Sequence, residues 1–206
     1  MKKLNLKKML DLRSLAIAGI FVLAITAISC NKEDDGYIPE TAFEQEAELK
    51  TGKAVKKGEL SIAEIAIAAG FDSLVVALTY VDMYEGTELV ELFLNGTDQY
   101  TVFAPTNTAF QNLVGDGQIA DLPSEVVLQV LLYHVTDGRR AANSVVPKKG
   151  YRTIESLLEQ KFMVSPTGMI KAFGNDAQID VAGGNFNISA SNGIIHVIDT
   201  VILPEL

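Results

Sequence analysis

The chain has 206 residues and a formal net charge of −9, with 26 acidic residues against 17 basic ones. This balance argues against nucleic acid as a partner, because binding phosphates requires a basic stripe, and the single cysteine, Cys30, excludes a disulfide within the chain. Hydrophobic residues make up 48% of the sequence, enough for a sizeable core in one domain.

Residues 1–29 have the three zones of a secretory signal. Five basic residues come first, and the run Leu15–Ile28 that follows is apolar except for two residues. This run is too short for a membrane-spanning helix, which needs about 20 residues. The sequence Ala27-Ile28-Ser29-Cys30 resembles a bacterial lipobox, in which a small residue precedes a cysteine that becomes acylated, although the motif prefers Leu at the position of Ala27.

We therefore expect cleavage before Cys30, lipidation of Cys30 and export to the cell envelope, with a lipid anchor in the outer membrane. The sequence does not specify which face of the outer membrane carries the protein. The alternative is that Cys30 is a buried thiol. Cleavage would remove five basic residues and one acidic residue, so the formal charge would fall from −9 to about −13. Such a charge favours solubility and repels anionic surfaces.

Residues 30–57 are expected to form a charged tether that leads to a folded region beginning at Gly58. The cluster Asn31–Gly36 resembles the acidic surface-export signal of lipoproteins in the Bacteroidetes group, and a solvated spacer is an equally good interpretation. Thr41–Lys50 is the one stretch of the tether that could form a marginal helix.

The folded region should start with a block of three helices. Ser61–Glu64 has the S-x-x-E spacing of a capping box, in which two orphan backbone donors are satisfied reciprocally. Apolar residues at helical spacing predict a second helix, which Asp72 or Ser73 would cap and Glu85-Gly86 would close. A third, short helix should end at the turn dipeptide Asn95-Gly96.

The remaining sequence mixes strand and helix patterns. Thr101–Ala104 is a short strand-forming run, and Pro123 begins an apolar helix. Lys161–Ser165 and Met169–Phe173 flank Pro166-Thr167-Gly168 and are expected to form a hairpin.

A second hairpin should pair Phe186–Ala190 with Ile194–Leu203. The Asn192-Gly193 pair between them tolerates the positive φ that a tight hairpin turn demands. Both alternating faces of the last strand are largely apolar, so this strand should be covered on both sides and lie centrally in the fold.

Three blocks, in this order, resemble the signature of fasciclin domains: Thr101–Phe110, Leu131–Val135 with its Tyr-His pair, and Ser191–Asp199. The resemblance covers residues 58–204. It implies an α+β fold, a β-sandwich-like wedge with an N-terminal helical block. It also implies that the Tyr133-His134 segment is a contact for cell-surface receptors.

The residues of these blocks also have a structural interpretation. Pro105 ends the first strand, and Thr106, Asn107 or Thr108 can cap a helical turn that carries Phe110 into the core.

Tyr133 and His134 lie where a helix gives way to a strand, so their polar atoms can meet backbone groups freed at that junction. The alternative to a receptor contact is that both side chains are buried with satisfied hydrogen bonds. In the closing block, an offset of three along a strand points His196 and Asp199 to opposite faces, which argues against a catalytic pair.

The sequence contains no G-x-S-x-G elbow, no H-E-x-x-H motif, no phosphate-binding loop and no cysteine cluster, so we expect no catalytic residue, metal site or cofactor. The leading hypothesis is a non-enzymatic adhesion or interaction module, lipid-anchored in the envelope, that binds a protein or a glycan. One alternative is a glycan-capture lipoprotein beside an outer-membrane transporter, with Tyr84, Tyr100 and Tyr151 as the exposed sugar-stacking cluster. Another is an enzyme, in which His134 or His196 meets an ionised partner in a pocket.

Overall fold

The computed structural model describes residues 57–206. The expected signal peptide, Cys30, the helix expected at Thr41–Lys50 and the tether up to residue 56 lie outside the described residues. In chain order the elements are α2 (Ile62–Ala68), α3 (Asp72–Glu85), α4 (Leu89–Asn95), β1 (Tyr100–Pro105), α5 (Asn107–Val114), the 3-10 helix η3 (Ile119–Asp121), α6 (Ser124–Tyr133), β2 (Val135–Asp137), α7 (Ala142–Val145), β3 (Arg152–Glu155), β4 (Lys161–Val164), β5 (Met169–Lys171), β6 (Asp176–Gln178), β7 (Ile188–Ala190) and β8 (Gly193–Ile198).

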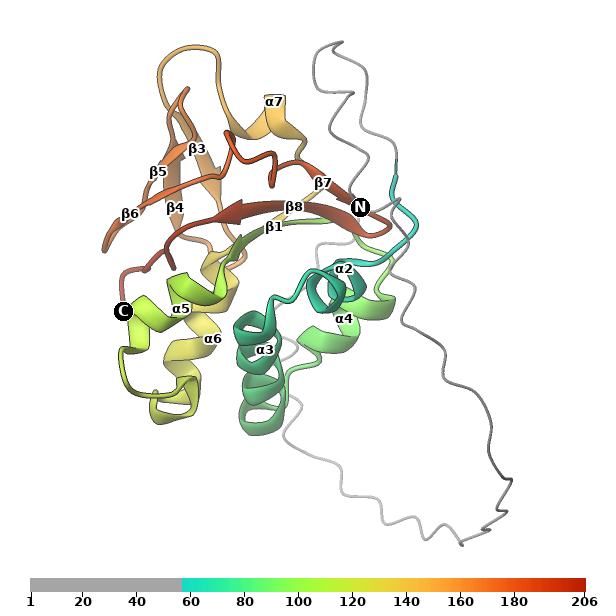
Figure 1. Cartoon of the computed structure of the whole chain (residues 1–206), viewed down its shortest axis with the longest axis vertical. Coiled ribbons are helices and arrows are strands. Elements are labelled where there is room, and N and C mark those ends of the chain that lie inside the picture. The colour runs from blue at the N-terminus through green and yellow to red at the C-terminus, as the bar shows by residue number, and fades with distance from the viewer. Residues whose placement is uncertain (1–56) are drawn as a thin grey trace, which may run out of the picture. The chain divides into compact units, whose positions relative to one another are not determined.

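The strands form two four-stranded sheets, with the orders β2-β1-β8-β7 and β3-β4-β5-β6 (Figure 1). Every pairing is antiparallel except β1 with β8, which run parallel from Tyr100 opposite Gly193 to Pro105 opposite Ile198. The two sheets and the preceding helices confirm the expected α+β fold.

The main hydrophobic core joins the two sheets. Phe103 of β1 meets Phe162 of β4 edge to face, with ring centroids 5.1 Å apart, and Tyr133 at the end of α6 packs against Phe162 in the same way at 5.6 Å. Edge-to-face pairs of this kind add to the stabilisation that burial of the rings provides.

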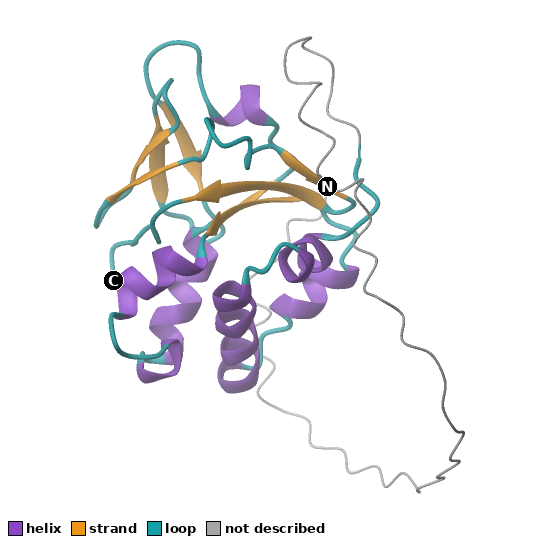
Figure 2. Ribbon diagram, viewed as in Figure 1, coloured by secondary structure: helices purple, strands orange, loops and turns teal. Residues whose placement is uncertain are grey.

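The other face of the first sheet is covered by helices. Figure 2 shows α2 to α6 gathered on one side of β1 and β8, while α7 lies on the opposite side. Because both faces are covered, all six residues of β8 are buried, which confirms its predicted central position. No helix among residues 57–206 is long and apolar enough to cross a membrane.

The helical block follows the predicted starts and stops with one exception. The Ser61 hydroxyl accepts from the Glu64 amide and the Glu64 carboxylate accepts from the Ser61 amide, so the capping box of α2 is confirmed. The cap predicted for α3 is wrong, because neither Asp72 nor Ser73 caps this helix with its side chain. The cap comes instead from Asn107 at the start of α5, which accepts a hydrogen bond from the Ser73 amide at 3.0 Å.

Both predicted hairpins form. β4 pairs with β5 through Met163 opposite Lys171, and the turn between them has Gly168 at φ +82°. In the β7–β8 hairpin the predicted reason for the Asn-Gly pair is wrong, since Gly193 is not among the residues with positive φ. Glycine is needed at position 193 because the start of β8 lies close to the backbone of β1. A Cβ atom at this position would lie 2.1 Å from the Tyr100 carbonyl oxygen.

The last strand is shorter than predicted. β8 ends at Ile198, and the chain bends at Asp199 and Thr200 instead of continuing to Leu203. Val201 and Ile202 are nevertheless buried, so the apolar run that suggested a longer strand reflects core packing of an irregular segment.

Candidate functional site

The three sequence blocks converge on the first sheet. The first block supplies β1 and the start of α5, the second ends α6 and begins β2, and the closing block supplies β8. β1 lies between β2 and β8, and its Phe103 is in register with His196. The signature residues therefore form one connected unit at the centre of the fold.

Tyr133 is fully buried in the core between the sheets. Its hydroxyl donates to the Lys161 carbonyl oxygen at 3.1 Å, which joins the end of α6 to β4. Burial is also the main cause of its raised pKa. In this conformation the Tyr133 side chain is not available to a partner.

His134 is 2% exposed and bonded through both ring nitrogens. Nδ1 lies 2.7 Å from the Val130 carbonyl oxygen, and Nε2 accepts from the Ile202 amide at 3.0 Å. Because a carbonyl can only accept, these two contacts require a neutral ring with its proton on Nδ1. Burial lowers the pKa of His134 to about 4, which agrees with the neutral form.

His196 is fully buried and has the opposite tautomer. Its Nε2 lies 3.0 Å from the Arg140 carbonyl oxygen, and its Nδ1 accepts from the Asn187 amide at 3.2 Å. Burial lowers its pKa to about 4 as well. Asp199 makes separate contacts, accepting from the Gln178 amide and the Thr200 hydroxyl, so the structure does not bring His196 and Asp199 together as a pair.

Asn192 holds the helical block to the sheet. Its side chain is 3% exposed, its Oδ1 accepts from the Ile62 amide at 2.8 Å, and its Nδ2 donates to the Phe93 carbonyl oxygen at 2.8 Å. The Asn192 side-chain amide thus caps the start of α2, 130 residues away in sequence, and also binds α4, 99 residues away.

The first block provides a second connection of the same kind. Thr106 caps α5 by accepting from the Ala109 amide at 3.2 Å, and the helix carries Phe110 into the core, both as predicted. Asn107 accepts from the Ser73 amide and donates to the Gly70 carbonyl oxygen at 2.8 Å. It therefore fixes the turn between α2 and α3.

Two residues of this framework carried no recognisable signal in the sequence. Asp82 of α3 caps α4, because its carboxylate accepts from the amides of Leu89 and Val90 at 2.8 and 2.9 Å. Arg139 donates to the Ala190 and Gly193 carbonyl oxygens and to the Ser189 hydroxyl, and so holds the β7–β8 hairpin. Both residues act on partners that are distant or irregular in sequence, which local spacing cannot reveal.

The three tyrosines predicted to form a sugar-stacking cluster do not form one. Tyr84 and Tyr151 are 65% and 53% exposed, but Tyr100 is buried against Phe93. Tyr84 lies on α3, whereas Tyr151 immediately precedes β3 in the second sheet. Tyr151 instead lies beneath a cation, with Lys171 Nζ 5.4 Å from its ring centroid.

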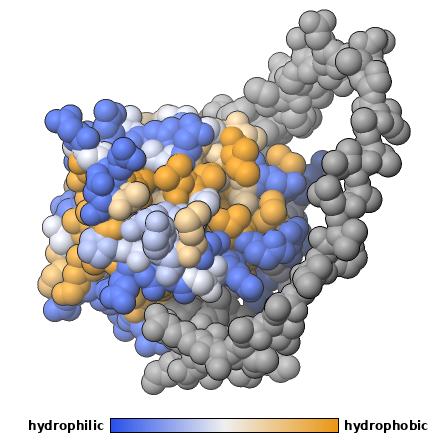
Figure 3. All heavy atoms as spheres, turned by 90° about the horizontal axis from the view of Figure 1, so that it is seen from below, coloured by the Kyte–Doolittle hydropathy of each residue, from blue (hydrophilic) through white to orange (hydrophobic). Residues whose placement is uncertain are grey.

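A small apolar cavity of about 50 Å³ lies among α2, α3, α4 and α6. Ile67, Leu78 and Val90 are among its lining residues, and His134 adds a ring whose nitrogens are already bonded. Figure 3 shows apolar residues at the centre of this helical side, bordered by hydrophilic ones. The cavity therefore offers packing but no free polar group to orient a ligand.

These observations define a class of protein: a two-sheet α+β domain in which the recognisable motif residues build the framework. Among residues 57–206, no three His, Cys, Asp or Glu side chains are placed to hold a metal ion. The family model of the fasciclin domain matches residues 77–204. The chain belongs to the fasciclin domain family.

Relatives share much of the chain. Protein sll1483 of Synechocystis sp. is 33% identical over 148 residues, which cover 69% of this chain and 73% of that protein. Immunogenic protein MPB70 of Mycobacterium bovis is 30% identical over 206 residues, covering 98% of this chain and 99% of that protein. In the solved structure of the FAS1 domain pair from the insect cell adhesion molecule fasciclin I, the similar chain is 16% identical, with a TM-score of 0.46 over 63% of this chain and 45% of that one.

Proposed function

We propose that this chain is a non-enzymatic interaction module that is displayed on the cell envelope and binds a protein or a glycan through its surface. The observation that carries the proposal is the state of the two histidines. Both are buried, both are neutral, and both use their two ring nitrogens on backbone groups. The signature residues are thus committed to a rigid scaffold, and contact with a partner is left to exposed residues and loops.

The enzyme alternative required a pocket in which His134 or His196 meets an ionised partner. Each histidine contacts only backbone amides and carbonyls through its ring nitrogens, and neither is accessible. We therefore set aside catalysis by these histidines. The glycan-capture alternative loses its three-tyrosine cluster, but it keeps Tyr151 as an exposed ring with a neighbouring cation.

We further propose that a lipid on Cys30 anchors the chain in the outer membrane. The basic start, the short apolar run and the lipobox-like residues before Cys30 support this step. The several acyl chains of a bacterial lipoprotein would make the anchor durable, since a single chain gives only marginal membrane binding.

Replacing Cys30 by serine should release the protein from membranes. We expect Cys30→Ser to move from the membrane pellet to the soluble fraction of the envelope and to lose incorporation of labelled palmitate. Ser29→Ala, which keeps a small residue before the cysteine, is the matched control and should stay in the membrane pellet. Tight membrane association of the Cys30→Ser protein would contradict the lipid anchor.

The binding proposal is tested by attachment. Cells that display the full chain should attach to surfaces coated with envelope or extracellular-matrix polymers in greater numbers than isogenic cells that lack it. A panel of hydrolase substrates, tested with the same purified chain, should show no turnover. Equal attachment by the two kinds of cell would contradict the proposal, and so would hydrolysis of a substrate.

A further inference from the structure

Charged residues are segregated along the folded chain. Residues 58–138, which include α2 to α6, contain 12 Asp and Glu residues and no Lys or Arg. Residues 139–173 contain seven Lys and Arg residues against two acidic ones. An acidic domain therefore has one basic region, and this region builds β3, β4 and β5 of the second sheet.

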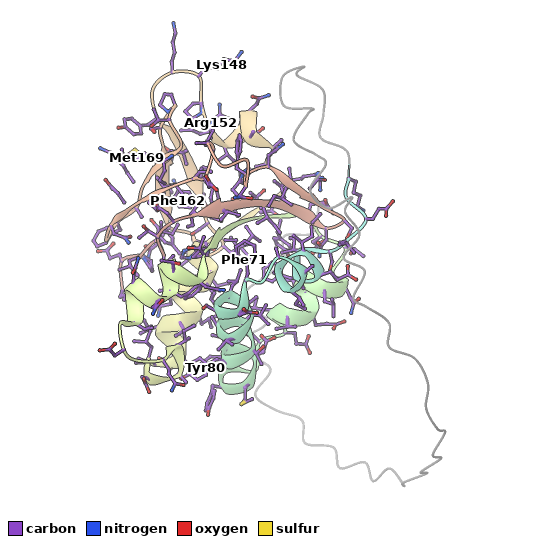
Figure 4. All side chains as sticks on the ribbon, in the orientation of Figure 1. Phe71, Tyr80, Lys148, Arg152, Phe162 and Met169 are labelled. Carbon is purple, nitrogen blue, oxygen red and sulfur yellow. The ribbon has the colours of Figure 1, made fainter. Side chains whose placement is uncertain are left out.

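One face of the second sheet is turned to solvent. Phe162, Val164 and Ile170 point into the core, so their neighbours along β4 and β5 point outward. The pairing register places Met163 beside Lys171 on this outer face. Figure 4 shows Met169 and Arg152 on this sheet, with Lys148 at the tip of the loop that leads into it.

The outer face combines exposed rings and thioethers with ammonium groups. Tyr151 and Phe173 are 53% and 66% exposed, and Met163 and Met169 are about 40% exposed. We call the following set the basic–aromatic face: Lys148, Lys149, Tyr151, Met163, Met169, Lys171 and Phe173.

Several charges near the face are already engaged. Lys161 pairs with Glu155 at 3.9 Å, and Arg152 donates to the Ser144 carbonyl oxygen at 3.0 Å. The register sets Met163 opposite Lys171 and Lys171 opposite Asp176, so Asp176 lies at the β6 edge of the face, whereas Glu155 lies on β3 at the other edge. The exposed Lys148 and Lys149 in the loop, together with Lys171 over the Tyr151 ring, supply the positive charge of the face.

We propose that the basic–aromatic face binds an acidic polysaccharide, a polymer of sugars that carries carboxylate or sulfate groups. The inference rests on the proposed function and names the partner class for it. The exposed rings offer flat apolar surfaces against which the C–H faces of sugar rings can stack, and the ammonium groups complement the anionic substituents. Neither feature alone would favour a sugar acid over another ligand.

Charge also favours a slender polymer over a bulky acidic partner. The acidic region, residues 58–138, and the net charge repel any globular protein of the same sign, including a second copy of this chain. A polysaccharide strand can contact the sheet face without bringing a large negative body near the helices. At physiological salt the repulsion is screened beyond roughly 8 Å, so a thin strand experiences mainly the local lysines.

The test measures binding of the full lipidated chain, in detergent, to alginate as the carboxylated polymer, heparin as the sulfated polymer and dextran as the neutral control. We expect at least one anionic polymer to bind and dextran not to bind. Lys148→Glu/Lys149→Glu should weaken binding about tenfold, since each exposed charge contact is worth a factor of roughly three and reversal makes it repulsive. The matched charge control is Lys56→Glu/Lys57→Glu, which reverses the charge of two other consecutive lysines. This control should bind as the wild type does.

The aromatic contribution has its own pair of variants. Tyr151→Ala should weaken binding about fivefold, whereas Tyr151→Phe, which keeps the ring, should bind normally. Wild-type binding by Lys148→Glu/Lys149→Glu would overturn the inference. Equal binding of polyglutamate, which has the charge without the sugar rings, would also overturn it. A third contradicting result is that no polysaccharide binds, and that the wild-type chain instead self-associates in sedimentation while Lys148→Glu/Lys149→Glu does not.

The same variants separate the inference from the proposed function. If displayed wild-type chain promotes cell attachment and Lys148→Glu/Lys149→Glu promotes it equally, the sheet face is not the contact and only the inference fails. If displayed wild-type chain promotes no attachment to any coated polymer, the proposed function itself fails.

Discussion

Acidification from pH 7 to pH 4 is expected to remove much of the stability of the folded domain. The pKa of His134 and the pKa of His196 are each lowered to about 4 by burial, whereas an unfolded histidine has a pKa of about 6.5. Below about pH 6.5 the unfolded chain binds a proton at each histidine while the folded chain does not. The stabilising contribution is therefore fully present above pH 6.5 and is lost as the pH falls toward 4.

The expected size follows from the two shifts. Each histidine should contribute on the order of 3 kcal/mol, which is large against a typical free energy of unfolding of about 5–15 kcal/mol. Between these limits the unfolded chain binds nearly two more protons than the folded chain. Urea unfolding at a series of pH values should therefore show the free energy of unfolding falling by about 2.7 kcal/mol per pH unit as the pH is lowered.

A single variant isolates one histidine. His134→Gln keeps a donor and an acceptor in the side chain but cannot titrate, so its pH dependence should fall to that of one proton. A free energy of unfolding that is flat from pH 7 to pH 4.5, or a His134 ring that titrates near 6.5 in the folded protein, would contradict the burial described above.

Asn192→Ala is expected to destabilise the domain by about 2–6 kcal/mol. The substitution leaves the buried Ile62 amide and the Phe93 carbonyl without partners, and each such loss costs roughly 1–3 kcal/mol. The helical block should loosen from the sheet before the sheets separate, because Asn192 joins α2 and α4 to the β7–β8 turn.

The measurement combines denaturant unfolding with hydrogen exchange. The Ile62 amide, which Asn192 protects, should exchange much faster in the variant. Asn112→Ala, an exposed asparagine of α5, is the matched control and should change stability by less than about 0.5 kcal/mol. Unchanged protection of the Ile62 amide in Asn192→Ala would show that another group caps α2.

The sequence predicted best those features that depend on local spacing. The capping box at Ser61 and the Lys161–Phe173 hairpin each arise within a few residues, where the pattern of apolar, polar and turn residues has a direct structural meaning. The central position of the last strand was also predictable, because apolar residues on both faces require cover on both sides.

Features that depend on distant partners were not predictable from spacing. The parallel pairing of β1 with β8 joins segments about ninety residues apart, and nothing in either strand specifies the other. The cap of α3 comes from Asn107 and not from Asp72, since the tertiary fold brings a better-placed amide to the helix start. Tyr100 follows a polar segment of the sequence and was predicted to be exposed, yet its position in β1 buries it.

The candidate site shows the same division. The signature blocks identified Tyr133, His134, Asn192 and His196, but only the structure shows that their polar atoms bind backbone groups. The basic–aromatic face has no motif, because it is assembled from a loop and two strands whose outward residues alternate with the core. Charge segregation along the chain is the one signal of it that the sequence contains.

The central claim is that the folded surface of this domain makes an adhesive contact. The most direct measurement is attachment of cells that display the full chain, counted with and without an excess of soluble Cys30→Ser protein. We predict that displayed chain increases attachment, that folded soluble protein abolishes the increase, and that the same protein unfolded by acid and kept unfolded does not. No increase on display, or an increase that folded soluble protein fails to compete, would contradict the claim.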